Sequence, residues 1–456
     1  MRVLKFGGTS VADAAAIARL VTIGAGRRGA RTVVVSALGG VTDRLLDIAA
    51  TAVVDLPAAR AALEDVIARH VEVAGALADP TARQMLDKML RAMGRGAEHS
   101  IEAIAASGAA SPALVDKLLA CGELWSSRLV TAFLADAGVH PQWIDARHVI
   151  RTDGTHGRAV PDLEATGRAV DRLVRPALAL DRVAVLGGFI GAAPNGATTT
   201  LGRGGSDYSA AIVGACLLAD EIEIWTDVDG VYSADPRVVP RARVLSTLSY
   251  EDAETLATFG AKVLHPKTIE PAAARDIPVR VLNSKRPLEP GTLIDNSSAG
   301  DTRYAAVAWR SGLTLLELTA RERGDGTFAS RALQALTDAH VSVIVGEVHK
   351  DRVTVAVDGS VDLAALGAHA GAFAEIRARD GLSAVCAVGG RLAHNPRLVT
   401  SAFALLDDRR IHLVARPGGS SALAVVVDDR DVHHLVTRLH DSFAVDAVPA
   451  VQAVAS

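Results

Sequence analysis

The sequence GATTTLGRGGSD, residues 196–207, is followed at once by the apolar stretch YSAAIVGACLLA. Before it lies VAVLGGFIG, residues 183–191, whose length and β-branched content are typical of a buried parallel strand. A strand, a glycine turn and a helix are therefore predicted in that order, with Ser206 or Gly205 as the helix cap. Arg203, bare backbone amides and the positive helix end would face one ligand, which suits an anion such as a carboxylate or a phosphate. For this stretch alone, a tight solvent loop is the alternative.

Composition narrows the class of protein. The chain has 456 residues, 49% of them hydrophobic and only 4% aromatic, which fits a soluble α/β protein of about two to four domains. A net charge of -4 without basic runs argues against a nucleic-acid partner. The widely spaced Cys121, Cys216 and Cys386 argue against disulfides and a zinc site. With no signal peptide pattern and no apolar run of membrane-spanning length, a cytoplasmic location without a membrane partner is expected.

The strand, glycine turn and helix plan occurs again at the N-terminus. Residues 2–6 predict a strand that ends in Gly7 and Gly8, and a helical stretch follows. Lys5 lies inside this apolar strand, where an unpaired ammonium group is costly, so its head is expected at the strand's carboxyl end. Doubly wound sheets bind ligands at that edge. An edge-strand lysine that points at water is the alternative, and the spacing excludes a Walker P-loop.

A second strand is predicted at residues 31–38, followed by a turn and a helix. Ser36 and Thr42 place hydroxyl groups around this turn, where helix capping is the default interpretation and ligand binding the alternative. Residues 58–108 have an all-helical pattern without a glycine turn, which we interpret as an inserted helical pair.

Glu123 is a carboxylate close to an apolar helical stripe. The long helix predicted at residues 113–137 places it among Leu119, Leu124 and Trp125. A carboxylate in such surroundings needs a partner, either a basic side chain or the ammonium group of a ligand. The alternative is a partly exposed glutamate at a helix kink.

A polar loop follows the strand predicted at residues 221–226. It carries aspartates, Tyr232 and Arg237, and it should lie on the ligand edge of a parallel sheet, although the aspartates could be turn formers only. Lys262 lies near a later helix start. The polar stretch at 296–303 is the best domain boundary.

The C-terminal third alternates short strands and helices in two cycles of β-α-β-β type. Paired small modules of this kind commonly bind effectors or mediate dimers. His433 and His434 are better explained by a solvated helix face than by a metal site.

Six motifs in the right order resemble those of a known family. They are KFGGTSV at 5–11, VSALGGVT at 35–42, GE at 122–123, TTTLGRGGSDY at 198–208, WTDVDGVYSADPR at 225–237 and TFGAKVLHP at 258–266. With them the whole chain resembles aspartate kinase (aspartokinase), in its monofunctional, lysine-sensitive-type branch. This resemblance implies the α/β amino acid kinase fold, with a mainly parallel central sheet sandwiched by helices.

The resemblance also implies a domain organisation. The amino acid kinase catalytic domain would cover residues 1–295, and two ACT-type βαββαβ regulatory domains would cover 296–456. The first ACT domain, roughly 313–385, would be inserted in the second, roughly 302–312 plus 386–456. Pairing of the ACT sheets makes a homodimer the default assembly.

The implied activity is the ATP-dependent phosphorylation of the side-chain carboxylate of L-aspartate to 4-phospho-L-aspartate. This phosphotransfer to a carboxyl group is the first step towards lysine, threonine and methionine. The pKa of an aspartate side chain in water is about 3.9, so the nucleophile is already ionised at neutral pH and no general base is required. Catalysis would come from holding two anions in line and neutralising charge on the transferred phosphoryl group.

The motifs carry roles onto residues of this sequence. Lys5, Arg203 and Asp207 would be catalytic. Aspartate would be bound through Ser36, Thr42, Glu123, Arg203, Gly204, Gly205 and Ser206, with Arg203 on a carboxylate and Glu123 on the ammonium group. ATP would be bound through Lys5, Phe6, Gly7, Gly8, Thr226, Asp227, Tyr232, Arg237, Lys262 and Val263. Mg²⁺ would be held mainly by ATP, with Asp207 as the candidate protein ligand.

One departure from the family pattern lies in the regulatory part. Lysine-sensitive relatives tend to have an aspartate after Ser-Val in the second strand of the first ACT unit, whereas Ile344 follows Ser342 and Val343 here. An apolar residue removes a partner for the ammonium group of an effector, so weak or altered lysine feedback is predicted. The alternatives are a non-catalytic ACT-type sensor, against which the intact motif residues argue, and a specialised-metabolism kinase for an aspartate analogue.

Overall fold

The computed structural model describes residues 1–27, 29–261, 266–296, 306–322, 324, 326–359, 361–389, 392, 400, 402–406, 409–417 and 422–445. By its internal contacts the chain divides into two compact units. The first comprises Met1–Gly230 and Lys267–Asn296, and the second comprises Val231–Pro266 and Ser297–Ser456. Residues 231–266 thus group with the C-terminal unit, although the sequence places them in the catalytic domain. The domain bounds of 1–295 and 296–456 stay a prediction.

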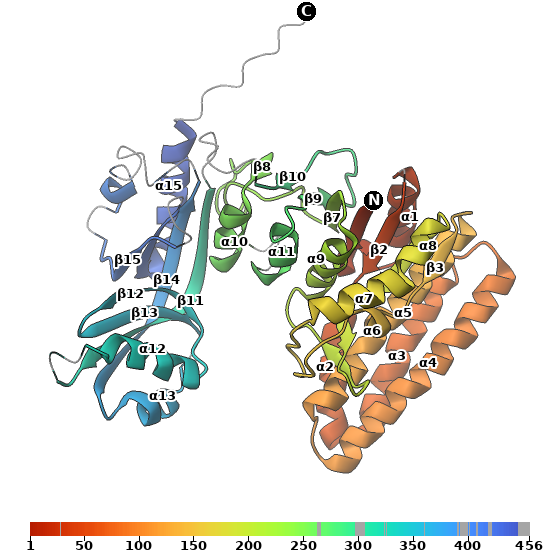
Figure 1. Ribbon diagram of the computed structural model, residues 1–456, viewed down its shortest axis with the longest axis horizontal. Coiled ribbons are helices and arrows are strands. Elements are labelled where there is room, and N and C mark those ends of the chain that lie inside the picture. The colour runs from red at the N-terminus through yellow and green to blue at the C-terminus, as the bar shows by residue number, and fades with distance from the viewer. Residues whose placement is uncertain are drawn as a thin grey trace, which may run out of the picture. The chain divides into compact units, whose positions relative to one another are not determined.

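A mainly parallel sheet forms the centre of the first unit (Figure 1). Its strands in this unit lie in the order β3-β4-β2-β1-β7-β9-β10, and all neighbours are parallel except β9 and β10. Their bounds are β1 Arg2–Phe6, β2 Arg31–Val35, β3 Pro141–Trp143, β4 Val183–Gly187, β7 Glu221–Thr226, β9 Val279–Asn283 and β10 Thr292–Ile294. The inner strands are apolar runs buried on both faces, as expected for parallel strands between helices.

Helices surround this sheet. They are η1 Gly8–Val11, α1 Ala14–Gly26, α2 Val41–Val54, α5 Pro112–Asp136, α6 Ala146–Val149, α7 Leu163–Leu173, α8 Arg175–Ala179, α9 Gly205–Leu217 and α11 Pro266–Ala273. The inserted helical pair is confirmed as α3 Leu56–Ala74 and α4 Pro80–Ser107, which run side by side and share one core with α2 and α5 (Figure 1).

Helix α5 is long and apolar enough to cross a membrane by length and composition, which the sequence pattern did not predict. However, 72% of its most apolar window is buried in the protein. Its apolar residues include Trp125 and Leu129, which belong to the core cluster shared with α2 and α4. The helix therefore acts as a core element in this structure.

The stretch around residues 183–207 is more structured than predicted. The expected single strand at 183–191 is wrong: β4 ends at Gly187, and a second short strand, β5 Ile190–Ala192, pairs antiparallel with β6 Thr198–Thr200. Phe189, between the two strands, has a positive φ of 64° and redirects the chain. The predicted helix is confirmed as α9, although Gly204, rather than Ser206 or Gly205, is its N-cap.

The second unit contains a six-stranded sheet in the order β12-β13-β11-β14-β16-β15, and all of its pairings are antiparallel. Its strands are β11 Ala306–Ala320, β12 Val343–His349, β13 Arg352–Asp358, β14 Ala374–Val388, β15 Leu413–Ala415 and β16 Ala422–Asp428. The helical elements include α10 Tyr250–Thr258, α12 Phe328–Asp338, α13 Leu363–Ala370, η3 Asp429–Asp431 and α15 Val432–Val445, and a short strand, β8, covers Thr247–Leu248. Strands β11 and β14 have 15 residues each, and they are long enough to pair with each other and with further strands on either side. The two predicted strand cycles therefore belong to one sheet.

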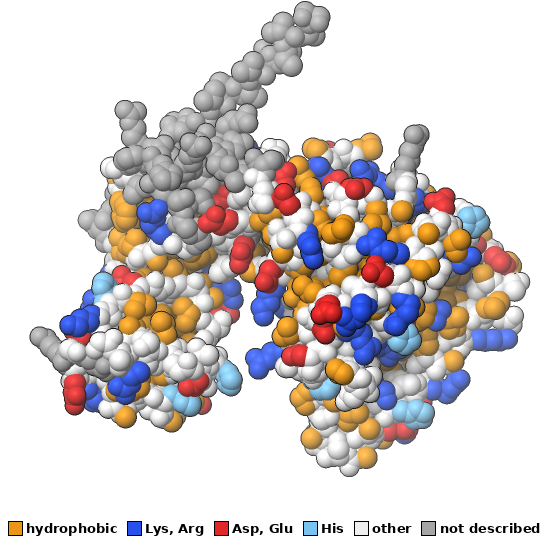
Figure 2. Space-filling view, viewed as in Figure 1, with side chains coloured by type: hydrophobic (Ala, Val, Ile, Leu, Met, Phe, Trp, Pro, Cys, Tyr) orange, Lys and Arg blue, Asp and Glu red, His pale blue; other side chains and the backbone are white. Residues whose placement is uncertain are grey.

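The surface mixes charges of both signs. On the face that Figure 2 shows, basic and acidic side chains are interspersed over the described atoms. The formal net charge of the chain is -4. Local charge, rather than an overall field, therefore has to account for the binding of any small ion.

Candidate active site

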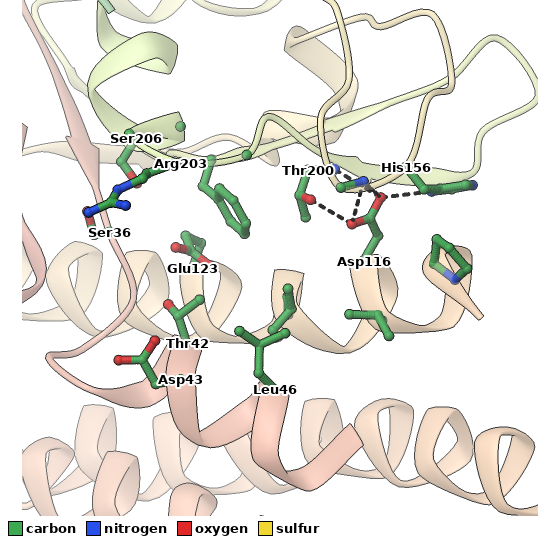
Figure 3. Close-up of a pocket in the computed structure, with 18 of the residues that line it drawn as sticks. Ser36, Thr42, Asp43, Leu46, Asp116, Glu123, His156, Thr200, Arg203 and Ser206 are labelled. Carbon is green, nitrogen blue, oxygen red and sulfur yellow. Dashed lines mark hydrogen bonds and ion pairs between the residues drawn. The ribbon is translucent and has the colours of Figure 1, made fainter. Parts of the chain in front are cut away.

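A cavity of about 840 Å³ in the first unit collects most of the residues predicted to bind aspartate. It lies where the first two strands end and where α2 and α9 begin, with α5 along one side (Figure 3). The predicted residues that line it are Lys5, Ser36, Thr42, Glu123, Arg203, Gly204, Gly205, Ser206 and Asp207. Groups from distant parts of the sequence therefore converge on one space.

Lys5 and Asp207 form an ion pair at the edge of this cavity. Lys5 is 7% exposed, and its Nζ lies 2.5 Å from Asp207 Oδ1. The carboxylate is in the first turn of α9, where the helix dipole favours a negative charge. Because β1 is an inner strand between β2 and β7, the alternative of an edge-strand lysine is wrong.

Glu123 lines the cavity with a carboxyl group that is almost completely buried. Gly122 lets α5 approach the turn after β2, because a Cβ at this position would lie 2.8 Å from the Cβ of Ala37. Glu123 Oε1 accepts a hydrogen bond of 3.1 Å from Ala37 N, and Oε2 has no hydrogen-bond partner among the residues that the structure describes. Such an oxygen suits a ligand's ammonium group.

Burial controls the protonation of this carboxyl group. Glu123 is 2% exposed, and desolvation raises its pKa to about 8. The hydrogen bond from Ala37 and the positive charge of Lys5 oppose this rise without cancelling it. Before a cationic ligand binds, the group is therefore mostly protonated at neutral pH.

Arg203 offers a positive charge to the cavity, and Figure 3 shows it beside Ser36 and Ser206. It lies between β6 and α9 and is exposed, and none of the hydrogen bonds and ion pairs described for this structure involves its side chain. Gly204, which follows it, has a φ of 72°, and this left-handed residue starts α9. The guanidinium and the helix N-terminus together form an anion-binding corner.

The predicted ATP residues are only partly brought together. Gly7 N donates a 3.1 Å hydrogen bond to the carbonyl of Trp225, so the turn after β1 lies beside the end of β7, where Thr226 and Asp227 are found. Phe6, Gly7 and Gly8 share this edge of the sheet. Tyr232 and Arg237 belong to the second unit, and Lys262 and Val263 lie outside the described residues. The complete nucleotide site stays a prediction.

Four polar cavity residues were not predicted from the sequence: Asp43, Asp116, His156 and Thr200. Asp116 had a signal, since a second acidic residue seven positions before Glu123 lies on the same side of an apolar helix. No signal in the sequence indicates His156 or Thr200, because only the tertiary fold brings their segments to α5.

Among the described residues, no group of three or more His, Cys, Asp or Glu side chains could hold a metal ion. Mg²⁺ that binds with a nucleotide is commonly held by one or two carboxylates and by phosphate oxygens. Asp207 is the carboxylate that the cavity offers close to Lys5.

The amino acid kinase family model matches residues 1–283. The chain belongs to the amino acid kinase family. This amino acid kinase is 34% identical to lysine-sensitive aspartokinase 3 of Escherichia coli over 455 residues, which cover 96% of the chain and 98% of that protein. It is 36% identical to aspartokinase of Chlamydia trachomatis over 64% of each chain. Among the family members, it therefore groups with the aspartokinases, as the six motifs predict.

Solved structures support the same relationship. The fold of this amino acid kinase matches Escherichia coli aspartokinase III in complex with aspartate and ADP, in the R-state, with a TM-score of 0.87 and 33% identity over 97% of this chain and 99% of that chain. The T-state of the same enzyme, in complex with lysine and aspartate, gives a TM-score of 0.78. The predicted fold class is confirmed.

Proposed function

We propose that this protein is an aspartate kinase, which transfers the γ-phosphoryl group of ATP to the side-chain carboxylate of L-aspartate. The observation that carries this proposal is the convergence of Lys5, Glu123 and Arg203 on one cavity. Its relatives support the proposal, because they are named aspartokinases and one of them is solved in complex with aspartate and ADP.

In this proposal, charge complementarity orients the amino acid. Arg203 binds a carboxylate of aspartate, and Glu123 Oε2 accepts a hydrogen bond from its ammonium group. The hydroxyl groups of Ser36, Thr42 and Ser206 and the amides of Gly204 and Gly205 surround the remaining oxygens. This arrangement would hold the other carboxylate towards the nucleotide, as in-line transfer requires.

The chemistry then needs charge neutralisation rather than proton abstraction. An oxygen of the ionised aspartate carboxylate attacks the γ-phosphorus, the bond from phosphorus to the bridging oxygen of ADP breaks, and ADP leaves with the electron pair. Lys5 neutralises phosphoryl charge, and Asp207 holds its ammonium group at the strand end. Asp207 would be the candidate protein ligand of a Mg²⁺ ion bound with ATP, and that ion would supply further neutralisation of phosphate charge.

An ATP-dependent hydroxamate assay with aspartate tests the proposed function. We expect activity with aspartate, and Arg203→Ala should lower kcat/KM more than about tenfold because a charged contact with the reacting substrate is lost. Arg168→Ala is a matched control, since this exposed arginine pairs only with Glu164 on helix α7 among the interactions described. No acyl phosphate from aspartate, with intact folding, would reject the proposal.

The alternatives are less favoured. A non-catalytic amino-acid sensor would not need Lys5, Glu123 and Arg203 together on one cavity. A kinase for an aspartate analogue would keep the same fold, and a panel of aspartate and close analogues in the same assay separates it from the main proposal. A higher kcat/KM for an analogue than for aspartate would favour that alternative.

Regulation and assembly complete the proposal. The second unit would bind an amino-acid effector, as aspartokinase III of Escherichia coli is found in complex with lysine.

Edges of the six-stranded sheet, β12 and β15, would pair two chains into a homodimer. A monomeric mass by light scattering would reject the dimer. The product would feed lysine, threonine and methionine synthesis in the cytoplasm.

A further inference from the structure

Asp116 is a buried carboxylate in the wall of the cavity that the proposed reaction leaves without a role. It is 1% exposed and lies on α5, seven residues before Glu123. At 1.5 Å per residue, about 10 Å of rigid helix separate the two carboxyl groups. A buried carboxylate is costly unless donors surround it, so its partners show what it holds in place.

The donors come from two other segments of the chain. Asp116 Oδ1 accepts a 2.6 Å hydrogen bond from Thr200 Oγ1, and Oδ2 accepts a 3.2 Å bond from Thr200 N. Gly157 N donates to both oxygens, at 3.2 and 3.0 Å, and His156 Nδ1 lies 2.8 Å from Oδ2 (Figure 3). Because these donors belong to the protein itself, Asp116 is a structural anchor rather than a ligand-binding group.

Both anchored segments lie against the loop that carries Arg203. Thr200 ends β6, three residues before Arg203. Ala159 N donates a 2.9 Å hydrogen bond to Thr200 O, so the segment around Gly157 also follows β6. A Cβ on Gly202 would lie only 3.1 Å from Gly157 O, and Gly202 has a φ of 78°. The backbone before Arg203 therefore rests on the segment that Asp116 holds.

We propose that Asp116 is a positioning residue for the amino-acid substrate, which sets the distance between the guanidinium of Arg203 and the carboxyl group of Glu123. One helix carries both Asp116 and Glu123, and Asp116 fixes the Arg203 loop to that helix. The inference rests on the proposed function, since Arg203 and Glu123 are the groups that would bind the two ends of aspartate. Misplacement of such groups by about 1 Å can cost a hundredfold in rate.

Substitutions separate positioning from general stability. Asp116→Ala removes every anchor, and we expect the KM for aspartate to rise at least about tenfold while the KM for ATP changes less than about twofold. Asp116→Asn keeps one oxygen acceptor, and its amide can donate to the Thr200 hydroxyl, so it should restore most of the affinity for aspartate. Thr200→Val removes one donor and should give an intermediate KM.

Asp145→Ala is the matched control. Asp145 is also a buried carboxylate of the first unit, 8% exposed and paired with Arg147, but it does not line the cavity. Both alanine variants should lower the melting temperature, and only Asp116→Ala should raise the KM for aspartate. Calorimetric titration with aspartate alone provides a second readout that does not depend on turnover.

The outcomes are distinct. An active wild-type enzyme with an unchanged aspartate KM in Asp116→Ala would overturn the positioning role and leave the proposed function intact. A wild-type protein without aspartate phosphorylation would overturn the proposed function instead. Should Asp116→Ala not fold, Thr200→Val decides the matter: a raised KM for aspartate supports positioning, and an unchanged one rejects it.

Discussion

At the scale of single residues, the burial of Glu123 changes its protonation and therefore affects how it binds a ligand. Its pKa is raised to about 8 by burial, so at neutral pH the ligand-free protein holds mainly the protonated carboxyl group. The ammonium group of a substrate interacts best with the ionised form. Binding of aspartate below pH 8 should therefore release a proton from Glu123, and the affinity should depend on pH.

We expect the dissociation constant for aspartate to fall as the pH rises from about 6.5 to 8. Its limiting slope should be about tenfold per pH unit below the pKa, and the curve should level off above it. Calorimetry in buffers of different ionisation enthalpy would measure both the affinity and the released proton. Glu123→Gln should bind aspartate more weakly and lack this proton release. The same pH dependence in Glu123→Gln would contradict the assignment.

The raised pKa also predicts a dependence of stability on pH. The pKa of Glu123 in the folded protein lies above the ordinary glutamate value of 4.5, so the folded protein holds more protons than the unfolded chain between about pH 4.5 and 8. The contribution of Glu123 to the free energy of unfolding therefore falls as the pH rises through this window. Urea unfolding at several pH values would show a shallower fall in Glu123→Gln than in the wild type.

At the scale of secondary-structure elements, the inserted helices brace the turns of the sheet. Arg69 on α3 donates from Nη1 to Gly39 O at 2.8 Å and from Nη2 to Ala12 O at 3.0 Å. These carbonyls belong to the turns that follow β2 and β1, and each turn contributes residues to the candidate site. The helical pair therefore holds these two turns in place, in addition to enlarging the core.

Arg69→Ala should destabilise the protein by roughly 1.5–3 kcal/mol, because two hydrogen bonds from a charged group are lost. Thermal unfolding would measure this as a melting temperature lower by several degrees, and kcat/KM should fall because both turns loosen. Arg91→Ala is the control on α4: its exposed pairs with Asp87 and Glu64 contribute little, about 0–1 kcal/mol. Equal losses in the two variants would contradict the bracing role.

Elements were easier to predict than their ends and pairings. The strands β1 and β7 and the helices α2, α5 and α9 follow from apolar periodicity and from glycine, which act over a few residues. The hairpin β5–β6 was missed, because three threonines inside a glycine-rich stretch form a strand only when β5 offers them hydrogen bonds.

At the scale of the whole molecule, feedback should differ from that of lysine-sensitive relatives. Ile344 lies half-buried in β12, at the position where the resemblance to lysine-sensitive aspartate kinases implies an aspartate. We expect most of the activity to persist at millimolar lysine, and Ile344→Asp to increase inhibition by lysine because a carboxylate attracts the effector's ammonium group. Assays with lysine, threonine or both would measure this. Strong inhibition of the wild type by lysine alone would overturn the prediction.

The sequence by itself determined the local elements and the chemical groups available for binding: a lysine at a strand end, a glutamate on an apolar helix and an arginine in a glycine turn. These signals are short in range, since they depend on periodicity and on backbone freedom. Only the tertiary structure decided which groups meet, as with Glu123 and Ala37, 86 residues apart, or Asp116 and Thr200, 84 residues apart. Such pairs depend on how buried surfaces pack and on which donors reach a desolvated carboxylate, and no local pattern contains that information.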